Sequence, residues 1–222
     1  MAQPLTEPLS RIVLATRNLG KVREFERLLS QMHSGIQVLG LADFPDMPDV
    51  EETGSTLEEN SLLKARAIAA FTSLPALADD SGIFVDALNG DPGIYSARWA
   101  GVHGDDQANL EKVLRQLEEL EASAEAAGDE ISRRAGFKTA VSLVIPSSSG
   151  ETTLVEHGEM RGEIIESPRG LNGFGYDPIF IPEGFDRTSA ELTPEEKDAI
   201  SHRGKAMRAM AARIHDLNLA AR

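Results

Sequence analysis

Two adjacent carboxylates, Asp79 and Asp80, are the most distinctive chemical feature of this 222-residue sequence. Neighbouring carboxylates repel, so such a pair is typical of a solvated turn or of a site that holds a divalent cation. Magnesium takes one or two protein carboxylates and completes its shell with water and phosphate oxygens, and Glu52, in an acidic loop, is a further candidate ligand. An aspartate-rich surface turn is the commoner alternative. We favour a ligand site because Ala76-Leu77-Ala78 predicts a strand that ends at the pair, and open α/β sheets bind ligands at the carboxyl ends of strands.

The segment Thr16-Arg17-Asn18-Leu19-Gly20-Lys21 has the residue types of a phosphate-binding turn. It joins an apolar run to a segment with helical spacing, and the unpaired N–H groups at a helix N-terminus attract anions. Thr16 and Asn18 add side-chain donors, and Lys21 adds a positive charge. The pattern of a Walker A loop is absent. An ordinary strand-to-helix turn, in which Gly20 only satisfies backbone geometry, is the alternative.

Two glycines flank an aromatic residue in Gly173-Phe174-Gly175-Tyr176-Asp177-Pro178. Glycines allow the backbone to approach a flat ligand closely, and Phe174 or Tyr176 has a ring that can stack on a base. Aromatic residues make up only 5% of the chain, which makes their concentration here informative. A tight turn with its aromatic rings in the core is the alternative, and we expect it to hold for at least one ring.

A local basic cluster follows near the C-terminus, with Lys197 and then Ser201-His202-Arg203-Gly204-Lys205. Its position near a predicted helix N-terminus suits a small anion. A solvated helix face is the alternative, and it explains Lys205 better than it explains His202 and Arg203.

The elements that must position these residues are predicted from apolar spacing and capping patterns. We expect strands at 11–16, 36–41, 76–78, 137–145, 152–157 and 178–181, and helices after Gly20, over 56–71 and 105–120, after Thr193 and near Ser201. Alternation over 137–145 predicts one buried face, and both Thr56 with Glu59 and Thr193 with Glu196 match the capping-box pattern. Residues 121–134 are expected to end a helix and continue as a solvated connector. With no internal repeat or long linker, the sequence predicts one α/β unit with a mixed sheet.

Composition excludes several classes of function. The absence of cysteine excludes disulfides, thiolate metal sites and cysteine nucleophiles. Lys and Arg number 22 against 36 Asp and Glu, a net charge of −14, which disfavours binding to nucleic-acid backbones. No apolar run reaches the roughly 18 residues of a membrane span. Residues 1–10 are polar, contain two prolines and lack a secretory signal, so we expect a frayed lead-in and a cytoplasmic protein.

Five ordered blocks resemble the inosine/xanthosine triphosphate pyrophosphatase family in its bacterial dITP/XTP form. They are LATRNLGKVREF, EETGSTLEENSLLKARAIA, ALADDSGIFVDALNGDPGIYSARWAG, GFGYDPIF and AELTPEEKDAISHRGKAM, and they span most of 11–212. Arg17 stands where many members have glycine, and 121–134 is locally divergent. The resemblance implies a single catalytic domain over 11–222, with a long central mixed sheet flanked by helices in two lobes. It also implies a nucleotide in the cleft between them, and a homodimer.

The implied reaction is magnesium-dependent hydrolysis of dITP, ITP or XTP to the monophosphate and pyrophosphate, without nucleic-acid or membrane partners. The resemblance assigns the triphosphate to Thr16, Arg17, Asn18, Leu19, Gly20 and Lys21, magnesium to Glu52 and Asp80 with Asp79 close by, and the role of proton acceptor to Asp80. It assigns substrate recognition to Ser81, Phe174, Gly175, Tyr176, Asp177, Lys197, His202 and Arg203. Two alternatives stay open: a purine nucleotide sensor without catalysis, and a pyrophosphatase for pyrimidine or other modified nucleotides.

Overall fold

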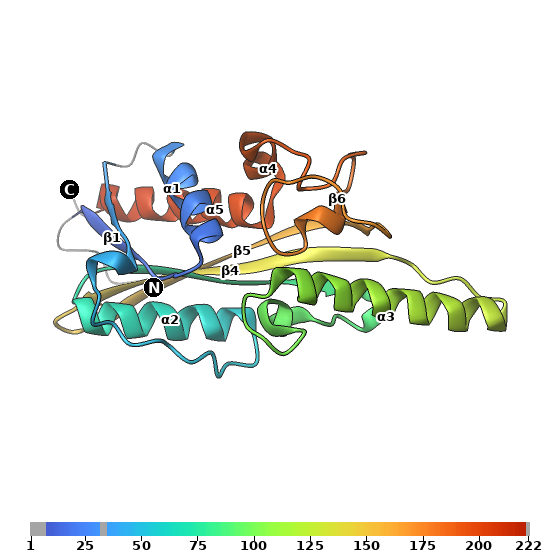
Figure 1. Ribbon diagram of the computed structural model, residues 1–222. Helices are drawn as coiled ribbons and strands as arrows, with labels where there is room; N and C mark the ends of the chain where they lie inside the picture. The colour runs from blue at the N-terminus through green and yellow to red at the C-terminus, as the bar shows by residue number, and fades with distance from the viewer. Residues whose placement is uncertain (1–7, 32–34, 221–222) are drawn as a thin grey trace. The chain divides into compact units, whose positions relative to one another are not determined.

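The computed structural model describes residues 8–31 and 35–220, so most of the expected N-terminal lead-in, residues 1–7, lies outside the described residues (Figure 1). Six strands form one sheet in the order β2-β1-β3-β4-β5-β6. Strand β1 (Arg11–Leu14) is parallel to β2 (Gln37–Leu39) and to β3 (Ala76–Val85), whereas β5 (Gly150–Ile164) is antiparallel to β6 (Phe180–Pro182). Strand β4 (Arg134–Ser147) lies between β3 and β5. The predicted α/β fold with a mixed sheet is confirmed.

The described chain forms two compact units. Unit 1 takes in the described residues of Met1–Asp80, Thr139–Gly158 and Arg203–Arg222, and unit 2 takes in Ser81–Lys138 and Glu159–His202. The prediction of a single catalytic domain and that of a cleft between two lobes stay predictions.

Unit 1 has helices on both faces of its part of the sheet (Figure 1). Helices α1 (Leu19–Gln31) and α5 (His202–Ala220) cover one face, where Phe25, Leu28, Met207 and Met210 pack on strand residues. Helix α2 (Leu57–Thr72) covers the other face through Ala65, Ile68 and Ala69. Because both faces are covered, β4 is buried on both, and the prediction that 137–145 buries only one face is wrong.

Unit 2 has its own apolar core. Helix α3 (Asp106–Ala127) contributes Leu110, Val113 and Leu117, which pack with strand residues and with Tyr176 and Phe180. The short helix α4 (Pro194–Ile200) and β6 also belong to this unit. Short 3-10 helices complete the described secondary structure: η1 (Leu41–Asp43), η2 (Asp86–Leu88), η3 (Gly93–Arg98) and η4 (Asp177–Ile179).

Strand β3 corrects the expected position of the acidic pair. The sequence predicts a strand over 76–78 that ends just before the pair, but β3 continues through both aspartates to Val85. Gly82 lets it continue, because a Cβ there would collide with the carbonyl oxygen of Gly93. The neighbouring strand β1 does end here, since its last partner in β3 is Leu77. The pair therefore lies inside its own strand but just beyond the carboxyl end of β1.

Helix boundaries follow the capping residues. Thr193 and Glu196 form the predicted capping box, and α4 ends at Ile200, so the predicted break near Ser201 is confirmed. Thr56 caps α2 as predicted, but the Glu59 carboxylate accepts from the backbone N–H and hydroxyl of Ser55 rather than closing a box with Thr56. Helix α3 ends at Ala127, as the helix-then-connector prediction expects. The strand predicted at 178–181 is wrong in its first half, because η4 precedes β6.

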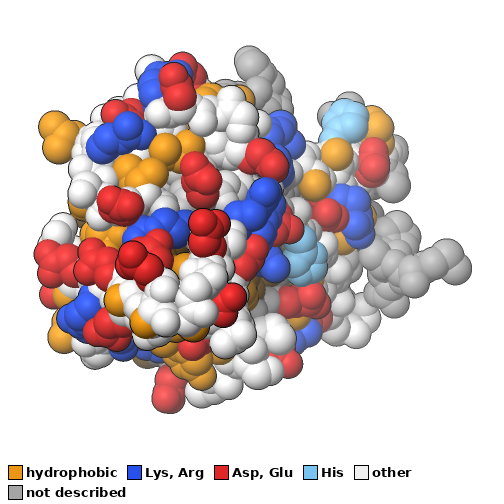
Figure 2. Space-filling model, turned by 90° about the vertical axis from the view of Figure 1, so that its right-hand side faces the viewer, with side chains coloured by type: hydrophobic (Ala, Val, Ile, Leu, Met, Phe, Trp, Pro, Cys, Tyr) orange, Lys and Arg blue, Asp and Glu red, His pale blue; other side chains and the backbone are white. Residues whose placement is uncertain are grey.

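Charged side chains cover much of the surface. Acidic and basic residues are interspersed over the face drawn in Figure 2, in keeping with the acidic composition of the chain. No helix in the described part of the chain is long and apolar enough to cross a membrane.

Candidate active site

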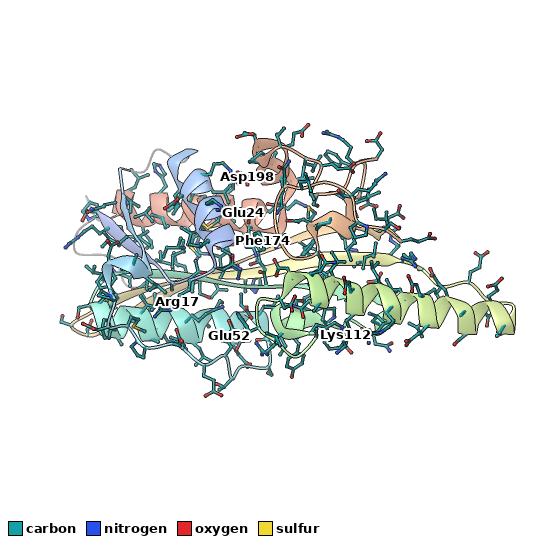
Figure 3. The ribbon with its side chains drawn as sticks, viewed as in Figure 1. Arg17, Glu24, Glu52, Lys112, Phe174 and Asp198 are labelled. Atoms are coloured by element: carbon teal, nitrogen blue, oxygen red, sulfur yellow. The ribbon has the colours of Figure 1, made fainter. Side chains whose placement is uncertain are left out.

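A largely buried group of charged and polar side chains, here called the carboxylate–lysine cluster, lies within unit 1. It draws on five segments of the chain: α1, the loop before α2, α2 itself, β3 and the start of α5. Figure 3 labels two of its members, Glu24 on α1 and Glu52 in the loop. The cluster consists of Lys21, Glu24, Glu52, Asn60, Lys64, Asp79, Asp80 and Arg203.

The Asp79 half of the cluster is a network of opposite charges. Lys21 Nζ lies 2.9 Å from Asp79 Oδ2, and Arg203 Nε donates to the same oxygen at 3.0 Å. Arg203 Nη1 also donates to Glu24 Oε2 at 2.7 Å. Lys21 and Glu24 are three residues apart on α1, a spacing that places them on one face. Burial opposes ionisation of Asp79, but Lys21 and Arg203 outweigh it and hold the pKa of this carboxyl well below its usual range.

The Asp80 half has the opposite electrostatic balance. Lys64 Nζ lies 2.6 Å from Glu52 Oε1 and 3.4 Å from Asp80 Oδ1, and Asn60 Nδ2 donates to Asp80 Oδ2 at 3.2 Å. Burial raises the pKa of Asp80 above its ordinary value, even though Lys64 and Lys21 act in the other direction. Two adjacent carboxyls with opposite pKa shifts are typical of sites that divide charge binding from proton transfer.

The carboxylates suit magnesium in one respect. Glu52 and Asp80 both approach a single cationic atom, Lys64 Nζ, and a hard cation that keeps several waters needs no more than two such oxygens from the protein. In the described chain no group of three or more His, Cys, Asp or Glu residues could hold a metal. Asp79 instead turns one oxygen to Lys21 and Arg203, and its Oδ1 is buried without a hydrogen-bond partner among the described residues. The residues therefore fit an ion bound by Glu52 and Asp80, and the magnesium site stays a prediction.

The predicted phosphate turn is a capped helix start. Thr16 Oγ1 accepts from the N–H of Asn18 at 3.2 Å, and Asn18 Oδ1 accepts from the N–H of Lys21 at 3.1 Å, which caps α1. Arg17 points to the 47–49 loop, where it donates to the Met47 carbonyl at 2.7 Å and pairs with Asp49 at 2.9 Å. Leu19 is exposed and Gly20 is half-buried. The turn thus aims the Lys21 side chain at Asp79, and triphosphate binding by the segment stays a prediction.

A second candidate region, here called the Phe174 turn (Gly173–Asp177), lies within unit 2. Asp177 Oδ2 accepts from the N–H of Phe174 at 2.9 Å and from Lys197 Nζ at 2.6 Å. Lys197 Nζ also lies 5.2 Å from the centroid of the Phe174 ring. The N–H of Gly175 donates to Asp106 Oδ2, at the start of α3, at 2.8 Å. Carboxylates from two elements therefore fix the backbone on either side of the ring.

The other predicted recognition residues have different surroundings. Tyr176 is buried in the core of unit 2, and its hydroxyl donates to the Ser96 carbonyl at 2.9 Å, so the expectation that one of the two rings belongs to the core is confirmed. His202 is 3% exposed and stacks on Phe137 with ring centroids 5.0 Å apart. Ser81 follows Asp80 on β3 and is half-buried. Arg203 lies in unit 1, where Asp79 and Glu24 engage its guanidinium.

Sequence analysis missed four residues of these two regions: Glu24, Asn60, Lys64 and Asp106. Asn60 and Lys64 are four residues apart on α2, so they share a face of the helix. That spacing, which puts an amide and a lysine on one face of the predicted helix beside the acidic pair's expected site, is the one signal that could have found them. Glu24 and Asp106 have no comparable signal, since acidic residues in helices are common.

Comparisons with known proteins cover nearly the whole chain. The model of the Ham1 family matches residues 12–213. A Streptomyces coelicolor protein named dITP/XTP pyrophosphatase is 50% identical over 209 residues, which is 94% of this chain and 99% of the relative. The structure of a HAM1 protein from Coxiella burnetii superposes with a TM-score of 0.79 at 43% identity, covering 94% of this chain and all of that one. A nucleoside-triphosphatase / dITP/XTP pyrophosphatase from Mycobacterium abscessus has a TM-score of 0.68 at 46% identity, covering 90% of this chain and 98% of that one.

Proposed function

The chain belongs to the Ham1 family, and on that premise we propose that it hydrolyses dITP, ITP and XTP to the nucleoside monophosphate and pyrophosphate. Such a reaction removes deaminated purine nucleotides from the nucleotide pool. The observation that carries the proposal is the buried pair Asp79 and Asp80, each within ion-pair distance of a half-buried lysine and with pKa values shifted in opposite directions. That arrangement suits a reaction in which one carboxyl takes a proton while fixed cations bind phosphate charge.

Asp80 is proposed as the proton acceptor. A water molecule attacks the α-phosphorus, the new O–P bond forms as the bond between the α-phosphorus and the bridging oxygen breaks, and pyrophosphate leaves. Asp80 takes the proton of the attacking water, and the raised pKa of its carboxyl makes it a better base than an ordinary aspartate. The reaction needs positioning and charge neutralisation rather than a covalent intermediate.

Lys21 and Lys64 are proposed to offset the charge of the triphosphate, together with the N-terminal turn of α1. Burial lowers the pKa of Lys21, although Asp79 opposes the shift, while the acidic neighbours of Lys64 outweigh burial and raise its pKa. Magnesium held by Glu52 and Asp80 would neutralise phosphoryl oxygens and lower the pKa of bound water. The triphosphate contacts are assigned to Thr16, Arg17, Asn18, Leu19, Gly20 and Lys21.

Base recognition is proposed for the Phe174 turn and its neighbours. A hydrogen-bond donor aimed at position 6 can bond the O6 atom of hypoxanthine or xanthine. Adenine has an amino group there, which is itself a donor, and such a mismatch can reject a substrate by about 10⁴-fold. The Phe174 ring offers a stacking surface, with the cationic Lys197 beside it. The residues assigned to recognition are Ser81, Phe174, Gly175, Tyr176, Asp177, Lys197, His202 and Arg203.

We also propose a cytoplasmic homodimer without nucleic-acid partners. The resemblance to the family supports the dimer, and the net charge of −14 argues against binding to polyphosphate backbones. Sedimentation of the purified protein would test the oligomeric state.

A substrate panel tests the function. The protein is incubated with magnesium and with dITP, ITP, XTP, dATP, dGTP and a pyrimidine triphosphate in turn, and pyrophosphate and orthophosphate are assayed separately. The expected result is pyrophosphate release with dITP, ITP and XTP and little with dATP or the pyrimidine triphosphate. The dGTP assay shows whether the site rejects the 2-amino group, because guanine also carries O6. Release of single orthophosphate would reject the mechanism, tight binding without turnover across divalent metals would favour a sensor, and preference for a pyrimidine would favour another nucleotide class.

A further inference from the structure

A single buried amide, that of Asn60, joins the proposed catalytic carboxylate to the loop that carries Glu52. Asn60 is on the first turn of α2 and is fully buried. Its Nδ2 donates to Asp80 Oδ2 at 3.2 Å, and its Oδ1 accepts from the N–H of Gly54 at 2.8 Å. Gly54 lies two residues after Glu52, so the two hydrogen bonds fix Asp80 and the Glu52 loop to the same helix turn.

The two hydrogen bonds determine which way the amide points. The N–H of Gly54 is a donor, so the atom of Asn60 that faces it must be the oxygen. The NH2 group then faces Asp80, which must accept. The loop fits closely here as well, because a Cβ at Gly54 would approach Asn60 Oδ1 to 2.7 Å.

Lys64 cannot supply the same constraint on Asp80. Its ammonium has three rotatable donors on a flexible chain and lies 3.4 Å from Asp80 Oδ1, so it provides charge with little directional preference. Asn60 is a planar group whose orientation is already fixed by Gly54, so it can set the plane of the Asp80 carboxylate.

We propose that Asn60 is a positioning residue for pyrophosphate release: it fixes the Asp80 carboxylate in the orientation that accepts the proton of the attacking water and ties it to the Glu52 loop. The kinetic part of this inference rests on the proposed function. Misplacement of a reacting group by about 1 Å costs about 10²-fold in rate, and this is the size of effect we expect.

Two substitutions separate the two hydrogen bonds. Asn60→Leu keeps the shape and removes both, without adding charge. Asn60→Asp keeps an oxygen for Gly54 and replaces the neutral NH2 donor to Asp80 with a second carboxyl. Ser61→Ala is the matched control, because Ser61 is the next residue of the helix, is equally buried and bonds Ser142 on β4 rather than Asp80.

The kinetic test measures kcat and KM for dITP. We expect both Asn60 variants to lose about 10²-fold in kcat with KM unchanged, and Ser61→Ala to match the wild type. If kcat depended only on the packing of this helix turn, Ser61→Ala would lower kcat as well. Wild-type kcat in either Asn60 variant, or an equal loss in Ser61→Ala, would overturn the proposal.

A second measurement is independent of activity. Amide hydrogen exchange should show the Gly54 N–H protected in the wild type and in Asn60→Asp but not in Asn60→Leu, and a crystal structure of Asn60→Asp should show the Asp80 carboxylate rotated. If the wild-type protein releases no pyrophosphate, the proposed function fails. The exchange and crystallographic measurements still test whether Asn60 fixes the Asp80 carboxylate and the Glu52 loop. An Asp80 carboxylate in its original orientation in Asn60→Asp would overturn the proposal.

Discussion

The carboxylate–lysine cluster and the Phe174 turn are both built around carboxylates, but they use them differently. In the cluster, the Asp79 carboxylate meets the side-chain cations Lys21 and Arg203. In the Phe174 turn, Asp177 and Asp106 mainly accept backbone N–H groups, and only Lys197 adds a cation. The first arrangement fixes charge, whereas the second fixes the path of the backbone and with it the place of a ring.

This difference predicts different responses to mutation. Charges buried together depend on one another, because the loss of one partner leaves an uncompensated charge in a low dielectric. A backbone turn held by several separate hydrogen bonds loses only about 1 kcal/mol with each one. We therefore expect the cluster to respond to substitutions with large, coupled effects and the Phe174 turn with small, separable ones.

The two carboxyls of the acidic pair make the sharpest comparison within the cluster. Asp80→Asn should lower kcat for dITP hydrolysis by about 10³-fold or more, because it removes the proposed base. The variant should unfold at or above the wild-type temperature, since burial penalises the charge it removes. Pyrophosphate release and thermal unfolding measure the two effects, and a variant with wild-type turnover would refute the role of Asp80.

Arg203 tests whether the charges of the Asp79 half are coupled. Arg203→Met removes the cation that contacts both buried carboxylates, Asp79 and Glu24, so we expect a loss of about 3–5 kcal/mol in the free energy of unfolding, measured by urea denaturation.

The charge-balanced double variant Glu24→Gln with Arg203→Met is the control. Because it removes one negative and one positive charge together, it should recover part of the loss. If Arg203→Met alone lowered the free energy of unfolding by less than about 1 kcal/mol, the network would behave like a surface ion pair.

Acid should weaken the same network in a defined direction. The pKa of Asp79 is held below its ordinary value of 3.8, so the stability gained from this carboxylate is complete above 3.8 and is lost as the pH falls toward the folded-state pKa. The stability difference between the wild type and Asp79→Asn should therefore stay constant from neutral pH to about pH 4.5 and shrink below about pH 3.8. Urea unfolding of both proteins across that range measures it, and a difference that does not change with pH would contradict the depressed pKa.

The parts of these regions that could be predicted from the sequence are those whose contacts join residues close together in the chain. Apolar spacing predicted α1 and α3, composition predicted α2, and the caps Thr56 and Thr193 were visible because a cap bonds to a residue three positions away. The adjacent carboxylates and the glycine-flanked aromatic residue pointed to the Asp79-Asp80 pair and the Phe174 turn, and the ordered blocks added the roles expected of them.

The opposite pKa shifts of Asp79 and Asp80 could not be predicted from their neighbours in the sequence, because they depend on burial in the fold and on cations such as Arg203, which is 124 residues away from Asp79. Strand β3 was predicted too short for a related reason. An acidic pair is unfavourable in a strand unless buried cations and an amide from other elements meet it, and these become neighbours only in the folded chain. The place of Tyr176 in the core could not be predicted either, because nothing in the local sequence distinguishes its ring from the nearby ring of Phe174.

The smallest expected effect lies in the Phe174 turn and concerns binding. Phe174→Ala removes a ring that can stack on a base, an interaction worth about 1–3 kcal/mol, so KM for dITP should rise about 10-fold or more while kcat changes little. Tyr95→Ala is the matched control: it removes another aromatic ring of unit 2 with a cation beside it, since the Arg98 guanidinium lies 5.3 Å from the Tyr95 ring centroid, but Tyr95 is not assigned to recognition, so KM should stay unchanged. A Tyr95→Ala variant that raised KM as much as Phe174→Ala would mean that the effect is not specific to the Phe174 turn, and that the two regions differ less than their contacts indicate.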